Sequence, residues 1–62
     1  MSNIIKYFKY KHLPEHLQEF SKQFHDLAIK LDSELPEGEE KQVGLRKLLE
    51  AKDCFVRSNL NN

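Results

Sequence analysis

The stretch LPEHLQEFSKQFHDLAIKLDSEL, residues 13–35, decides the fold of this 62-residue chain. Its large apolar side chains recur at steps of mostly three and four residues: Leu13, Leu17, Phe20, Phe24, Leu27, Leu31 and Leu35. That spacing places them on one face of an α-helix, and Ala28 widens the face. Pro14 suits the first turn of a helix, where its missing N–H costs nothing, and Pro36 ends the pattern. The sequence therefore predicts a helix over residues 13–35.

A turn and a second helix follow. Pro36 and Gly38 predict a tight turn over residues 36–39. A second helix is predicted over residues 40–58, with residues 59–62 as a frayed tail. Its apolar residues are Leu45, Leu48, Leu49, Ala51, Phe55, Val56 and Leu60. They cover roughly half of the helix circumference, which is wider than one partner helix needs.

The predicted fold is all-α, a single domain over residues 1–62 built as an antiparallel helical hairpin. The short connection between two long helices favours that arrangement. Residues 1–12 are predicted to form a short helix or an extended arm. A chain of this size buries only about 60% of the surface that its unfolded form exposes. Since the lone Cys54 cannot form an intrachain disulfide, we expect self-association, through the wide face of the second helix, to complete the core.

Charge is balanced overall but segregated along the chain. Ten basic and ten acidic residues give a net charge of +0, with +3 on residues 1–12 and −3 on residues 13–35. The neutral balance argues against binding of polymeric nucleic acid, whereas a small anionic ligand remains open. We expect a cytoplasmic protein, because the chain lacks an apolar run of membrane-spanning length and a signal-peptide pattern. Without any recognisable catalytic motif, we expect neither an enzyme nor a bound cofactor.

The N-terminal segment KYFKYKH, residues 6–12, alternates aromatic and basic side chains. Such rings can stack on nucleobases at about 1–3 kcal/mol each while lysines neutralise phosphates. Alternatively, Tyr7, Phe8 and Tyr10 fill the small core and the lysines extend to solvent. Phe8 is the clearest core candidate because it has no polar group. Whether one of the tyrosines faces a ligand stays open.

Charged residues on the second helix also allow two interpretations. Arg46–Glu50 and Asp53–Arg57 have the spacing of surface ion pairs. As an alternative, Arg46 or Arg57 binds phosphate, for which a guanidinium is well shaped. The residues alone favour the solvated pairs. Lys52 falls within the apolar stripe; we expect it to reach solvent at the edge of an interface, the alternative being an anion or acid across a subunit boundary.

Three histidines are the remaining candidates for chemistry. His12 and His16 are four residues apart, but Pro14 lies between them, and Cys54 is distant in sequence. His25 stands alone on the first helix. We expect cap or surface histidines and no metal site.

Two segments taken together resemble a known family. They are YKHLPEHLQ at 10–18 with Ser21 and FHDLA at 24–28, and LPEG at 35–38 followed by LRKLLEAKD at 45–53 and by Val56 and Arg57. The combination resembles the phage anti-CBASS cyclic-oligonucleotide sponge family, and the hairpin is similar to that of phage sponges for the Thoeris signalling molecule. The resemblance spans roughly residues 8–58.

The resemblance implies a compact homohexamer that binds cyclic dinucleotides, with cyclic trinucleotides as a further ligand class, in pockets between protomers. The ligand is held and not cleaved, so that the host CBASS effector stays inactive in the cytoplasm of the infected cell. The alternative function is a small protein-interaction module that docks a partner protein through its apolar helix face.

The resemblance also implies roles for individual residues. Tyr10 best matches the residue that stacks on a base, and Tyr7 is second. Lys22 or Lys30 matches the phosphate-binding lysine of the first helix, and His25 is a substitute in the same region. Arg46 and Arg57 become candidates for a second type of pocket.

Overall fold

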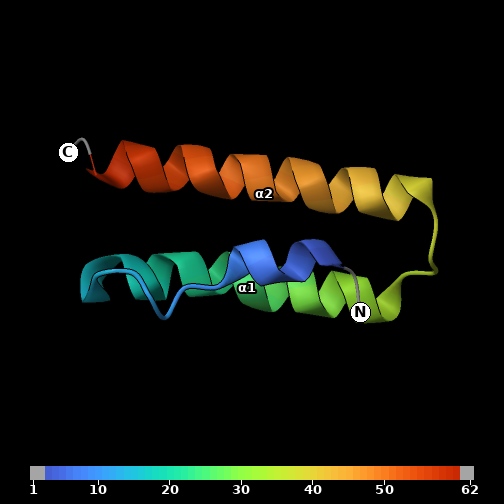
Figure 1. The fold of residues 1–62 in the computed structure, drawn as a ribbon, viewed down its shortest axis with the longest axis horizontal. Coiled ribbons are helices and arrows are strands. Elements are labelled where there is room, and N and C mark those ends of the chain that lie inside the picture. Colours follow the sequence, from blue (N-terminus) through green and yellow to red (C-terminus); the bar gives the residue numbers. More distant parts are fainter. Residues whose placement is uncertain (1–2, 61–62) are drawn as a thin grey trace.

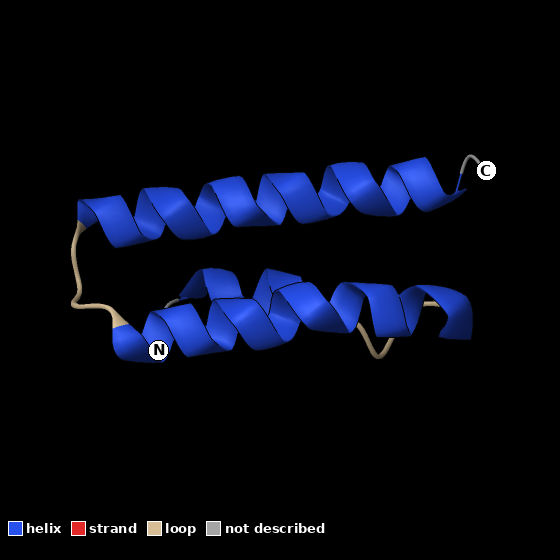
Figure 2. Ribbon diagram, turned by 180° about the vertical axis from the view of Figure 1, so that it is seen from behind, coloured by secondary structure: helices blue, strands red, loops and turns tan. Residues whose placement is uncertain are grey.

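The computed structural model describes residues 3–60, which form three helical elements (Figure 1). A 3-10 helix, η1, covers Asn3–Phe8; α1 covers Glu15–Glu34, and α2 covers Glu39–Leu60. Helices α1 and α2 run antiparallel and pack on each other, and η1 packs against both, on one side of the hairpin (Figures 1 and 2). The predicted all-α hairpin is confirmed, and the N-terminal segment is a short helix followed by a loop.

The helix ends differ slightly from the predicted ones. Pro14 occupies the N-cap position with ψ of 149°, so it precedes the helix and is not part of its first turn. Leu35 is extended, as expected for the residue before a proline. Helix α2 continues to Leu60, so the predicted tail is partly helical, and residues 61–62 lie outside the described part of the chain.

The core lies where the three elements meet. Ile5 and Phe8 from η1, Ala28 from α1 and Leu45 from α2 are buried against one another. Phe8 is completely buried, at 0% exposure, which confirms the prediction for this residue. Full burial of such a side chain contributes about 1.5–3 kcal/mol, so η1 is an integral part of the fold.

Lys41 is a buried charge that joins the ends of the two long helices. Its Nζ lies 2.9 Å from Asp32 Oδ1 and 2.6 Å from Glu37 Oε1, and it donates to the Asp32 carbonyl at 2.6 Å. The side chains of Lys41 and Asp32 are each only 3% exposed. Hydrogen bonds to Glu37 and then Asp32 raise the pKa of Lys41 above its ordinary value of 10.5, although burial opposes the shift. Lys41 therefore satisfies a carbonyl in the last turn of α1 and fixes the turn.

Lys52 is also buried, which corrects the expectation that it reaches solvent. The residue is 8% exposed, and its Nζ donates to the Tyr7 carbonyl at 3.1 Å. Asp53 Oδ1 lies 3.0 Å from the same nitrogen. The last turn of η1 lies close to this part of α2, so the ammonium group has a carbonyl and a carboxylate within its own chain. Lys52 thus ties η1 to α2.

Several apolar side chains remain exposed, on both long helices and in the turn between them. Phe55 is 51% exposed, and Leu27, Leu35 and Val43 are also exposed. Phe55 stacks on Phe24 with ring centroids 6.0 Å apart, toward the end of the hairpin away from the turn. Within residues 3–60, neither long helix has the length and apolar content needed to cross a membrane.

Candidate functional site

A hollow of about 450 Å³ lies beside the loop that joins η1 to α1. We call it the arm pocket; its lining residues are Lys9, Tyr10, Lys11, His12 and His25. Four of them are consecutive in the loop, and His25 comes from α1. The lining therefore combines aromatic and basic groups and includes no carboxylate.

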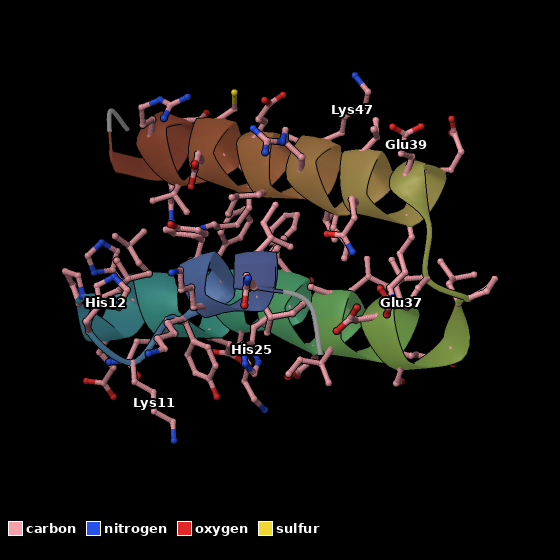
Figure 3. The ribbon with its side chains drawn as sticks, turned by 45° about the vertical axis from the view of Figure 1, so that its right-hand side comes forward. Lys11, His12, His25, Glu37, Glu39 and Lys47 are labelled. Carbon is pink, nitrogen blue, oxygen red and sulfur yellow. The ribbon has the colours of Figure 1, made fainter. Side chains whose placement is uncertain are left out.

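Tyr10 and His25 meet in the arm pocket although 15 positions separate them in sequence. Their ring centroids lie 5.2 Å apart with an edge-on angle of 64°. His25 Nδ1 lies 3.3 Å from Asp26 Oδ1, which leaves Nε2 as the ring nitrogen available to a ligand. Lys11 and His25 project on the same side of the molecule, away from α2 (Figure 3).

This lining suits an anion that carries a planar ring. Tyr10 offers an aromatic surface, and Lys9 and Lys11 offer two ammonium groups close by in sequence. Aromatic rings that stack on bases, together with basic side chains that meet phosphates, are how proteins bind single-stranded nucleic acid without sequence preference. The pocket is open to solvent on this single chain, so a ligand seated there would keep part of its surface exposed.

A second hollow, of about 840 Å³, lies between η1 and one face of α2. This α2 groove brings together Tyr7 and Arg46, and Lys6 Nζ lies 5.2 Å from the centroid of the Tyr7 ring. Its lining also carries three carboxylates, on Glu39, Glu50 and Asp53. Three carboxylates outweigh the two cations, so the α2 groove suits a phosphate-bearing ligand less well than the arm pocket does.

The remaining predicted site residues line neither hollow. Lys22 forms a surface ion pair with Asp26 at 3.9 Å, and Lys30 forms one with Glu34 at 4.0 Å. Arg57 Nη2 lies 3.4 Å from Cys54 Sγ. The structure therefore brings Tyr10 to His25 and Tyr7 to Arg46, and it leaves Lys22, Lys30 and Arg57 apart from both pairs.

The two ion pairs predicted on α2 do not form in the described part of the chain. Asp53 pairs with its neighbour Lys52, which the buried Tyr7 carbonyl holds in place, and is not paired with Arg57. Arg46 and Glu50 both line the α2 groove without pairing with each other. Residue spacing alone suggested the pairs, whereas the contact of Lys52 with the Tyr7 carbonyl of η1 places its ammonium group beside Asp53.

Sequence reasoning named the segment 6–12 as a possible nucleotide-binding arm but did not select Lys9, Lys11 or His12 individually as ligand-binding residues. The signal was present, because the basic run KYKH directly precedes the helix-starting Leu13-Pro14. Residues just before a helix lie close to its first turns, so the side chains of residues 9–12 could have been expected near the start of α1. No three His, Cys, Asp or Glu side chains within residues 3–60 lie close enough to hold a metal ion.

Comparisons with protein-family models, with curated proteins and with solved structures gave no match for this chain. The candidate site therefore depends on its own geometry and on the resemblance of the two sequence segments.

Proposed function

We propose that the protein binds cyclic dinucleotides, and cyclic trinucleotides as a further class, without cleaving them. By holding these second messengers it would block CBASS signalling in the cytoplasm of an infected host cell. The arm pocket carries this proposal: Tyr10 packs against His25 among lysines, and no carboxylate lines the hollow. The resemblance to the sponge family supports the same ligand class.

Each group of the ligand has a counterpart in the arm pocket. A base stacks on Tyr10, whose ring packs edge-on against His25, and the phosphates meet Lys9 and Lys11. Lys22 pairs with Asp26, the neighbour of His25, so it is the nearer of the two lysines first considered on α1. Binding of this kind needs no nucleophile and no general base, in keeping with a non-catalytic role.

A second copy of the chain would cover the open side of the arm pocket. A cyclic dinucleotide has two bases and two phosphates related by approximate two-fold symmetry, and a two-fold between identical chains supplies each contact twice. The exposed Phe55 and Leu27 support further burial between copies. We therefore propose a homo-oligomer, and the resemblance points to a hexamer.

Calorimetry with cyclic di-GMP, cyclic di-AMP and a cyclic trinucleotide tests the proposal. Tyr10→Ala should weaken binding at least about fivefold, since one base stack is worth about 1–3 kcal/mol. Size-exclusion chromatography should show its assembly unchanged. Tyr7→Ala is the matched control, because Tyr7 lines the other hollow. Ligand released by heating should be intact. Absence of binding to all three nucleotides refutes the proposal, and a hydrolysed product would indicate an enzyme.

Exposed apolar side chains support one alternative function, a module that binds another protein. Val43 and Phe55 lie on α2 and are about half exposed, as expected of a surface that docks another protein. A protein-interaction module would capture one partner at fixed stoichiometry and bind no nucleotide.

A further inference from the structure

Gln18 reaches back from α1 to the loop that lines the arm pocket. Its Nε2 donates to the Leu13 carbonyl at 2.8 Å and lies 3.3 Å from the Lys11 carbonyl. These contacts span Pro14 and join the start of α1 to residues five and seven positions earlier. Gln18 is partly buried and lies outside the pocket lining.

The loop needs such a donor because its own backbone has few partners. Pro14 has no N–H and no side chain that could cap the helix. Within the loop, the Leu13 N–H donates to the Tyr10 carbonyl at 3.1 Å, which closes one turn. The carbonyls of Lys11 and Leu13 accept instead from Gln18. A glutamine amide carries two N–H groups, so one side chain can serve both carbonyls.

The other end of the loop is held by a separate contact. Lys52 donates to the Tyr7 carbonyl, and the next residue, Phe8, is completely buried. The four loop residues that line the arm pocket therefore lie between a fixed point at Phe8 and a fixed point at Leu13.

We infer that Gln18 is a positioning residue that holds the arm-pocket loop ready for its ligand. The inference rests on the proposed function, because it assigns a role in binding to a residue that does not touch the ligand. A loop that is already ordered does not lose further conformational freedom on binding, and affinity rises accordingly. Without the Gln18 amide, the ligand must order Lys11 and Tyr10 itself.

The test compares Gln18→Met with Gln23→Met. Methionine keeps the length and helix propensity of glutamine and removes the donor. Gln23 is on the same helix, and its Nε2 donates only to the Phe20 carbonyl of that helix at 3.3 Å. We expect Gln18→Met to weaken binding of cyclic di-GMP by about two- to tenfold in calorimetry, because the ligand must then order the loop side chains itself. Gln23→Met should bind like the wild type.

Hydrogen exchange supplies the readout that needs no ligand. The Leu13 amide is protected by the Tyr10 carbonyl, and its exchange should accelerate in Gln18→Met while amides in the middle of α1 and α2 exchange as in the wild type. Unchanged affinity overturns the inference, and so does weaker binding with unchanged Leu13 exchange, which would mean that Gln18 touches the ligand. If the wild type binds no cyclic nucleotide, the proposed function fails first, and exchange alone still decides whether Gln18 orders the loop.

Discussion

Ser21 carries a buried hydroxyl without a hydrogen-bond partner in the described part of the chain. The residue lies on the buried face of α1, one turn after Leu17, at 0% exposure. A buried hydroxyl without a partner costs about 1–3 kcal/mol. Alanine is also the better helix former by up to ~0.7 kcal/mol. Removing the oxygen leaves a small void, which lowers stability by a few tenths of a kcal/mol at about 24 cal/mol per Å³ and so reduces the gain slightly. We therefore expect Ser21→Ala to stabilise the fold by about 1–3 kcal/mol.

Urea unfolding at one fixed protein concentration measures this gain, because self-association would otherwise change the apparent stability. In a chain of this size, each 1 kcal/mol also raises the melting temperature by about 4–8 °C. Ser33→Ala is the matched control: Ser33 lies on the same helix, is exposed, and donates to the Lys30 carbonyl at 2.9 Å. Ser33→Ala therefore gains the helix propensity of alanine but removes no buried hydroxyl that lacks a hydrogen-bond partner.

The reasoning predicts that Ser21→Ala exceeds Ser33→Ala by at least ~1 kcal/mol. A Ser21→Ala protein less stable than the wild type would refute it, because the hydroxyl would then have a partner. Equal gains from the two substitutions would also refute it, since helix propensity would account for the whole effect.

Three further predictions concern the fold. Gly44→Ala should stabilise α2 by about 0.8–1.0 kcal/mol in urea unfolding, because an added Cβ meets no atom within 4 Å; lower stability would reveal a surface packed there. Phe8→Ala should lower the free energy of unfolding by about 3–5 kcal/mol, a large part of the roughly 3–9 kcal/mol expected for a chain of this size. Circular dichroism should show a lower melting temperature, and a loss below ~1 kcal/mol would contradict the packing of Phe8. The pKa of Lys41 is raised in the folded state, so charged Lys41 contributes fully to the free energy of unfolding below its ordinary pKa of 10.5. That contribution is lost as the pH rises through the higher pKa of the folded state. Urea midpoints should therefore fall above about pH 10.5 in the wild type, and less steeply in Lys41→Met; parallel curves would contradict this.

Local spacing predicted the hairpin because helix formation and its apolar face depend on residues three and four positions apart. Pro36 and Gly38 placed the turn for an equally local reason. Phe8 was predicted in the core because it lacks any polar group, and it is fully buried. The helix ends moved by one or two residues, since Pro14 acts at the N-cap and not inside the first turn.

The buried lysines show what local spacing misses. Lys41, Leu45, Leu48 and Lys52 follow one another at steps of four, three and four, so both lysines lie on the core-facing stripe of α2. Their acceptors are the carbonyls of Asp32 and Tyr7, and only the packing of α1 and η1 brings these within reach. In both cases, a lysine on the core-facing side of α2 donates a hydrogen bond to a backbone carbonyl of another helix that packs there.

The arm pocket was predictable only in part. The aromatic and basic character of residues 6–12 was evident, and Tyr10 and His25 were each singled out. Their meeting depends on the loop folding back along α1, which follows from long-range contacts such as Lys52 to Tyr7. No periodic pattern encodes that path.

The placement of the two tyrosines allows ligand binding to be followed by the intrinsic fluorescence of the protein. The chain contains no tryptophan and only two tyrosines, so its ultraviolet emission comes from Tyr7 and Tyr10. One lines the α2 groove and the other the arm pocket. Replacing either with phenylalanine leaves a single emitter in a known hollow. Titrating a nucleotide into Tyr7→Phe and Tyr10→Phe would then report, without any attached dye, which hollow is filled.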